Sequence, residues 1–154
     1  MNALSDTQVA DFLREHFVAT YMKVGTFQIV GGRKVGGNVA SYFCLPDGAV
    51  IHAVAGKSNG PAFLNEARWA WETRRSALTL STDLVSGQVD SARMRSEVKK
   101  AHHERYQTAN LVTQQTQVHW LLGTRPLARI DEVYPTVWQE ILREKLSGLP
   151  VAMR

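Results

Sequence analysis

The first quarter of the chain predicts a helix followed by a strand. Residues 5–17 begin with small polar side chains typical of a helix start, and apolar residues then recur at helical spacing. Residues 18–24 alternate with a period of two, which predicts a strand. Gly25 either ends this strand or marks a bulge, after which residues 26–30 continue it.

The next segment predicts a loop, a hairpin and a second helix. Residues 31–37 contain four glycines beside two basic residues, but they match no phosphate-loop pattern and are predicted to form a flexible connector. An apolar run then reaches Pro46-Asp47-Gly48, which predicts a tight turn into a second strand over residues 49–55. Asn59-Gly60-Pro61 is typical of a helix start, so a helix is expected to follow.

The second half of the chain has mostly helical patterns. Residues 81–87 break the preceding helix, and residues 89–110 predict another. Residues 112–122 alternate between apolar and polar side chains and are predicted to form a strand. Apolar residues return to helical spacing over residues 130–146, where Pro135 requires the helix to begin nearby or to kink.

Composition is that of an ordinary soluble domain. The 154 residues are 44% hydrophobic and 21% charged, which is enough for a core, and no run is long and apolar enough to span a membrane. A single cysteine excludes an internal disulfide and favours a reducing compartment, so a cytoplasmic protein is expected. The net charge is +4, but the basic residues are interleaved with acidic ones, so this charge does not by itself indicate a nucleic-acid partner.

Two motifs resemble the thioredoxin-like superfamily. They are VADFLREHFV at residues 9–18, followed by YMKV at residues 21–24, and VGGNVASYFCLPDG at residues 35–48. The resemblance implies an α/β fold with a thioredoxin-like sheet and flanking helices. On this interpretation residues 1–80 form the core, and residues 81–154 form a helical extension that packs on it.

The chain departs from that family where the family's chemistry lies. The redox motif would precede the first helix, and a single cysteine cannot supply a Cys-x-x-Cys pair. Val39 stands where the family has its cis-proline, so a trans peptide and a reshaped loop are expected. Cys44 lies within an apolar strand, where a cysteine is usually inert. We therefore expect no dithiol oxidoreductase activity, no catalytic residues and no cofactor.

The family's first strand, which lies in the middle of its sheet, has no counterpart in this sequence. Its loss would leave unpaired backbone groups in the sheet. We expect either that Val112–Leu122 fills the position or that a second copy of the chain pairs along the open edge.

Histidines give no recognisable metal motif. His102 and His103 are adjacent, and neighbouring residues on a helix point about 100° apart, so the two cannot easily share an ion. His16, His52 and His119 are scattered along the sequence. No metal site is therefore expected.

Protein binding or scaffolding, with a protein partner or a second copy, is the predicted function. Its candidate residues are two tryptophans, a type enriched at binding hot spots, and the reshaped loop: Trp69, Trp71, Asn38 and Val39. The alternative is a nucleic-acid-binding helix with the basic residues Arg93, Arg95, Lys99, Lys100 and Arg105. An enzyme whose site forms no sequence motif is a third possibility, and no membrane partner is expected.

Overall fold

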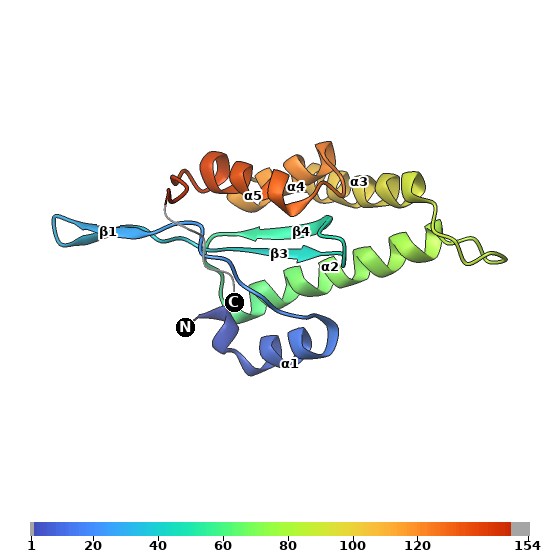
Figure 1. The fold of residues 1–154 in the computed structure, drawn as a ribbon, viewed down its shortest axis with the longest axis horizontal. Helices are drawn as coiled ribbons and strands as arrows, with labels where there is room; N and C mark the ends of the chain where they lie inside the picture. The colour runs from blue at the N-terminus through green and yellow to red at the C-terminus, as the bar shows by residue number, and fades with distance from the viewer. Residues whose placement is uncertain (1, 149–154) are drawn as a thin grey trace.

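A β-hairpin lies between two layers of helices in the computed structural model, which describes residues 2–148 (Figure 1). Within these residues the fold is mixed α/β, with five α-helices and two antiparallel sheets of two strands each. The helices are α1 (Thr7–His16), α2 (Gly60–Ser81), α3 (Ser91–Gln107), α4 (Gln114–Thr124) and α5 (Ile130–Thr136). The strands are β1 (Phe27–Val30), β2 (Arg33–Gly36), β3 (Ala40–Cys44) and β4 (Val50–Ala55).

The central hairpin of β3 and β4 confirms the predicted tight turn. Gly48 has a φ of 85°, a conformation that glycine adopts without strain, and its N–H donates to the Leu45 carbonyl at 2.9 Å. The Asp47 carboxylate accepts a hydrogen bond from the Ala49 N–H at 3.0 Å. β3 and β4 then pair antiparallel, with an irregularity between Phe43 and Cys44.

Side-chain caps fix the starts of α1 and α2. The Asp6 carboxylate accepts from the N–H groups of Gln8 and Val9, so Asp6 is the N-cap of α1. At α2, the Asn59 side chain accepts from the Ala62 N–H at 2.9 Å, and a proline occupies the first turn, as the sequence predicts. Together α1 and α2 cover one side of the central hairpin (Figure 1).

Both faces of β4 are buried, each in its own apolar cluster. Ile51 and Val54 belong to a cluster formed with residues of α1, α2 and α3. Val50 and Ala53 belong to a second cluster with residues of α4 and α5 and the segment after it. β4 is therefore the element on which the two helical layers meet.

β1 and β2 form a separate hairpin that projects away from the body (Figure 1). Gly31 and Gly32 both have positive φ, which suits the two-residue turns of hairpins. The prediction of a flexible connector over residues 31–37 is therefore wrong. Gly31 and Gly32 make a tight turn, and residues 33–36 then form β2, which pairs antiparallel with β1. The strand predicted over residues 26–30 is confirmed by β1.

Two predicted strands are wrong. Residues 18–24 form no named strand, and Val18 is fully exposed, so the alternation there faces solvent instead of a core. Residues 112–122 fall mostly in α4, which begins with a capping box between Thr113 and Thr116. The buried residues Val118, Leu121 and Leu122 are spaced three and four apart, so they share one helix face that packs on β4. The same residues also fit an alternation of apolar and polar side chains, which is why a strand was predicted.

The C-terminal part holds the base of the projecting hairpin. After Pro135 the helix widens into a π-helix over Val137–Ile141, as expected where a proline removes a backbone donor. Trp138 is buried against Gly25, and its indole N–H donates to the Lys145 carbonyl at 3.2 Å. The Glu144 carboxylate accepts from the Asn38 N–H at 3.2 Å. The helix predicted over residues 130–146 is confirmed in its first part and ends earlier than expected.

Candidate functional site

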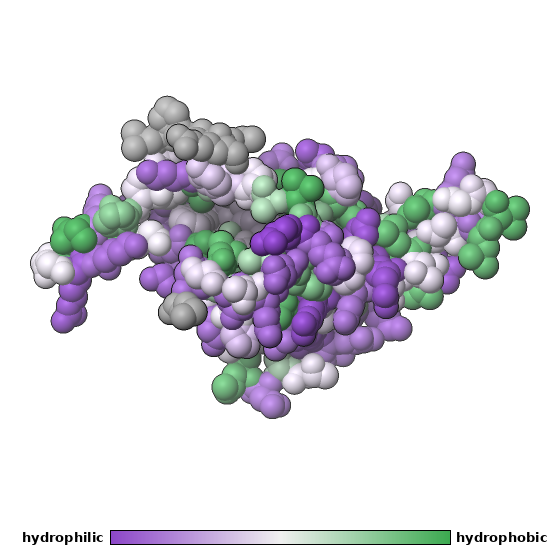
Figure 2. Space-filling model, turned by 90° about the horizontal axis from the view of Figure 1, so that it is seen from below, coloured by the Kyte–Doolittle hydropathy of each residue, from purple (hydrophilic) through white to green (hydrophobic). Residues whose placement is uncertain are grey.

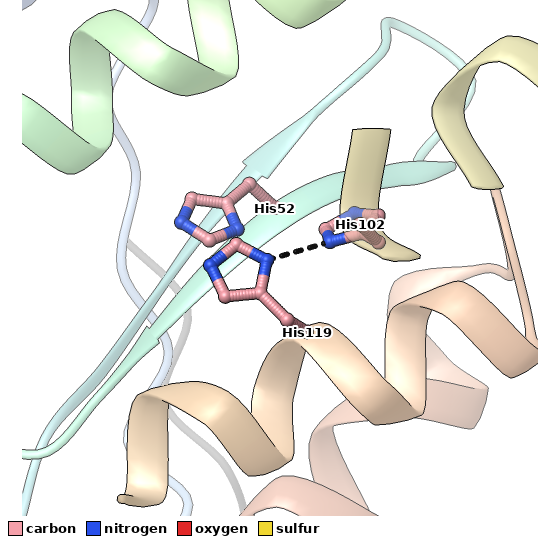
Figure 3. A group of neighbouring side chains, drawn as sticks. All are labelled: His52, His102 and His119. Carbon is pink, nitrogen blue, oxygen red and sulfur yellow. Dashed lines mark hydrogen bonds between the residues drawn. The ribbon is translucent and has the colours of Figure 1, made fainter. Parts of the chain in front are cut away.

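Three histidines from distant parts of the chain meet in the interior of the protein (Figure 3). His52 lies in the middle of β4, His102 on α3 and His119 on α4. His52 and His102 are fully buried, and His119 is 3% exposed. One ring nitrogen from each lies within 4.8 Å of those of the other two. We call these three residues the histidine cluster.

Hydrogen bonds to oxygen atoms fix the protonation of two rings. The Nε2 of His102 lies 2.9 Å from the Ile51 carbonyl, which can only accept, so Nε2 carries the hydrogen and Nδ1 has a lone pair. The Nδ1 of His119 lies 2.9 Å from the Nδ1 of His102. Because the His102 nitrogen has a lone pair, the His119 nitrogen carries the hydrogen and donates it. The Nε2 of His52 lies 2.7 Å from the carboxylate of Glu66, so its Nδ1 also has a lone pair.

The Nδ1 atom of His52 is buried and has no hydrogen-bond partner in the described part of the chain. Buried polar atoms of this kind are uncommon, because each costs free energy that a partner would recover. Gln115 does not supply that partner, since its amide group donates to the Ala53 carbonyl at 2.8 Å and approaches His52 at Nε2. The lone pair on the Nδ1 of His52 is therefore buried without a donor.

Glu66, Arg105 and Trp69 close the cluster on its outer side. Burial opposes ionisation of Glu66, but the hydrogen bond from His52 and the charge of Arg105 outweigh it, so the pKa of this carboxyl is lowered. The Arg105 guanidinium lies 3.9 Å from Glu66 and 5.3 Å from the centre of the Trp69 ring. Trp69 in turn meets His52 and His119 edge-on, with ring centres 4.6 and 5.0 Å apart.

All three imidazoles are neutral in this environment. Burial, with a smaller contribution from the neighbouring histidines, lowers the pKa of His102 to about 3 and that of His119 to about 2. Burial also lowers the pKa of His52, although the bond to Glu66 opposes the change. Neutral imidazoles with free lone pairs can accept a proton or bind a metal ion.

The predicted protein-binding residues do not form one surface. Trp69 is half-buried against the histidine cluster, whereas Trp71 packs on His16 of α1, with ring centres 4.6 Å apart. Asn38 and Val39 lie at the base of the projecting hairpin, where Val39 is 46% exposed. The peptide bond at Val39 is trans, since residues 2–148 contain no cis peptide.

The predicted nucleic-acid-binding residues lie on different sides of α3. At 100° per residue, Arg93 and Lys100 lie on one side of the helix and Arg95 and Lys99 on the opposite side, and all four are exposed. Arg105 instead turns toward Glu66 and Trp69. The structure therefore does not gather the five basic residues into one stripe.

Cys44 lies at the end of β3 and is half-buried. Burial, and to a smaller extent the nearby charge of Asp47, raise the pKa of its thiol to about 11. A thiol with so high a pKa is a poor nucleophile at neutral pH. This environment fits the expectation that Cys44 is inert.

The histidine cluster was not predicted from the sequence, because its members lie far apart in the chain. One signal was available on α3, where Met94, Val98 and His102 recur every four residues and place a histidine on the buried stripe. A second was His52, which stands among apolar residues in the middle of a predicted strand. Neither signal identifies the other members of the cluster.

Comparisons with known proteins give no relative. No protein-family model, no curated protein and no solved structure matches the chain. Among the described helices, none has the length and apolar character needed to cross a membrane.

Proposed function

We propose that this chain is a redox-inactive protein-binding module that associates with a second copy of itself through β1. The observation that carries the proposal is the projecting hairpin of β1 and β2, which pairs with no other strand in the described part of the chain. An isolated two-stranded hairpin is only marginally stable in water and is a ready template for another strand.

Apolar side chains cover this hairpin on both faces. Phe27, Ile29, Val30 and Val35 are each more than half exposed, at 56%, 63%, 58% and 55%. In the space-filling view, apolar residues are visible on the projecting left end of the molecule (Figure 2). An exposed apolar group of this kind is typical of a surface that is covered in an assembly.

Charge distinguishes the two edges of the hairpin. β2 carries Arg33 and Lys34, so two β2 edges placed together would bring four positive charges close to one another. β1 has the sequence Phe-Gln-Ile-Val and carries no charge. A second copy is therefore expected to pair along β1 and to leave both basic strands on the outside.

A twofold arrangement with one particular register brings the apolar residues of the two copies together. An axis perpendicular to the sheet at Gln28 pairs Gln28 with Gln28 of the second copy, and Phe27 with Ile29 of the second copy. Phe27 and Ile29 lie on the same face of β1, so four large apolar side chains would form one continuous strip across the joined hairpins. Such cross-strand pairs stabilise antiparallel sheets.

We also propose that the chain is related to thioredoxin-like proteins and has lost their redox function. Support for the relationship comes from the order of the β3–β4 hairpin and α2, and from the two motifs in the sequence. Support for the loss of function comes from Cys44, which is the single cysteine of the chain and has a raised pKa.

Light scattering on the full chain tests the assembly. The expected mass is that of a dimer, and Ile29→Lys should convert it to a monomer by placing like charges in the new pairing. Val35→Lys is the matched control, since Val35 is similarly exposed but lies on β2, and this variant should remain dimeric. A monomeric wild-type protein, or the same mass for both variants, would overturn the proposal.

A further inference from the structure

We propose that the histidine cluster is a binding site for one divalent transition metal ion, with Zn²⁺ as the ion that its donors fit best. The site joins β4, α3 and α4, and it is independent of the self-association through β1. Three features support it: the donor atoms, the groups behind them, and the lone pair without a partner.

The donor atoms have the chemical form that a metal requires. Imidazole nitrogens with a lone pair are the ligands that Zn²⁺ and its neighbours in the first transition series prefer. His52 and His102 each present such a lone pair at Nδ1, because an oxygen atom holds the hydrogen on Nε2. His119 lies beside them and can present a lone pair when its proton moves to the other ring nitrogen.

The groups behind the rings match those found around metal centres. A histidine ligand usually donates its second N–H to a carboxylate or a backbone carbonyl, which orients the ring and increases its basicity. Glu66 has this position behind His52 at 2.7 Å, and the Ile51 carbonyl has it behind His102 at 2.9 Å. Two of the three rings are therefore oriented as they would be around an ion.

Distances allow an ion with small movements of the rings. In a tetrahedral zinc site the ligand nitrogens lie about 3.3 Å apart, given a metal–nitrogen distance of about 2.05 Å. One nitrogen pair of the cluster is 2.9 Å apart, and all three donors lie within 4.8 Å of one another. The adjustment is on the order of an ångström, which rotation of the side chains can provide.

A metal ion also explains what a purely structural cluster leaves unexplained. Three neutral rings that only packed together would have no reason to leave the His52 Nδ1 buried without a donor. Three protein ligands leave a fourth position to water or another small ligand, as in zinc sites that are not closed by four side chains.

Titration of the chelator-treated full chain with Zn²⁺ tests the site. One Zn²⁺ per chain should raise the melting temperature, since binding to the folded state alone stabilises it. Co²⁺, used as a spectroscopic probe, should give the intense visible bands of tetrahedral coordination. Nitrogen NMR of the imidazoles should show Zn²⁺-dependent shifts at Nδ1 of His52 and His102. No change in melting temperature and no shift at these atoms would overturn the proposal.

Variants separate coordination from packing. Glu66→Gln leaves all three ligands in place and should weaken Zn²⁺ binding by about 10- to 100-fold, the usual effect of losing a group behind a ligand. A Glu66 that only helps packing would instead lower the melting temperature equally with and without Zn²⁺. His103→Gln removes the exposed histidine next to His102 and should leave binding unchanged. Loss of binding in His103→Gln with normal binding in Glu66→Gln would place the ion on the surface and refute the site.

Discussion

Mild acid should destabilise the metal-free protein strongly, because the folded histidine cluster accepts protons only at a much lower pH than the unfolded chain does. The usual pKa of histidine is 6.5, whereas that of folded His102 is about 3 and that of folded His119 about 2. Between pH 6.5 and these values the unfolded chain binds more protons than the folded one. Stability is therefore complete above pH 6.5 and falls as the pH is lowered.

The size of the effect follows from the two pKa differences. Each histidine that is protonated only in the unfolded state costs about 1.4 kcal/mol per pH unit below 6.5, so lowering the pH from 7 to 5 costs about 2 kcal/mol for each ring. His102 and His119 together give about 4 kcal/mol, and His52 acts in the same direction because its pKa is also lowered. This is a large part of the 5–15 kcal/mol that stabilises a typical domain.

Urea unfolding in the presence of a chelator, at pH 7 and at pH 5, measures this difference. Most carboxylates titrate below this window, so the histidines dominate the change. The variant His103→Gln removes an exposed imidazole and should show nearly the same loss of stability as the wild-type protein, since the charge of His103 is a minor cause of the lowered pKa of His102. A loss of less than about 1 kcal/mol for the wild-type protein would show that the cluster is hydrated or already protonated, and would refute the reasoning.

Three further predictions concern the thiol, a helix cap and the core. A thiol pKa of about 11 instead of 9.0 leaves about 100-fold less thiolate at neutral pH, so iodoacetamide should modify Cys44 far more slowly in the folded than in the urea-unfolded protein; equal rates would contradict its burial. Asp6→Ala removes the acceptor for two N–H groups of α1 and should cost about 1 kcal/mol in urea unfolding, whereas Asp6→Asn should cost less; equal losses would exclude a capping role. Leu122→Ala truncates a fully buried side chain and should lower the stability by about 2–5 kcal/mol by the same measurement, and a change within error would show that α4 does not pack as described.

Elements with local signals could be predicted from the sequence. The turn at Asp47-Gly48 needs only a residue that tolerates positive φ between two apolar runs, and the start of α2 needs only Asn59 and Pro61. In both places the chemistry that fixes the backbone lies within a few residues. The predicted hairpin and helix were therefore confirmed.

Elements decided by distant contacts could not be predicted in the same way. In α4, Trp120 and Val118 would share a face of a strand, but Trp120 is 55% exposed and Val118 is fully buried. What selects the helix is the packing of Val118 and Leu122 on β4, about 65 residues earlier in the chain. The histidine cluster depends on the same packing, because it needs β4, α3 and α4 to be in place before its members meet.

The attachment of the projecting hairpin has a consequence for protein synthesis. The Asn38 N–H is held by Glu144, a separation of 106 residues, and Gly25 rests on Trp138. While the nascent chain grows, the hairpin leaves the ribosome long before the residues that fasten its base. The position of the hairpin on the body is therefore fixed only when the chain is almost complete, and until then a chaperone or a neighbouring nascent chain on the same messenger can bind it before it is fastened.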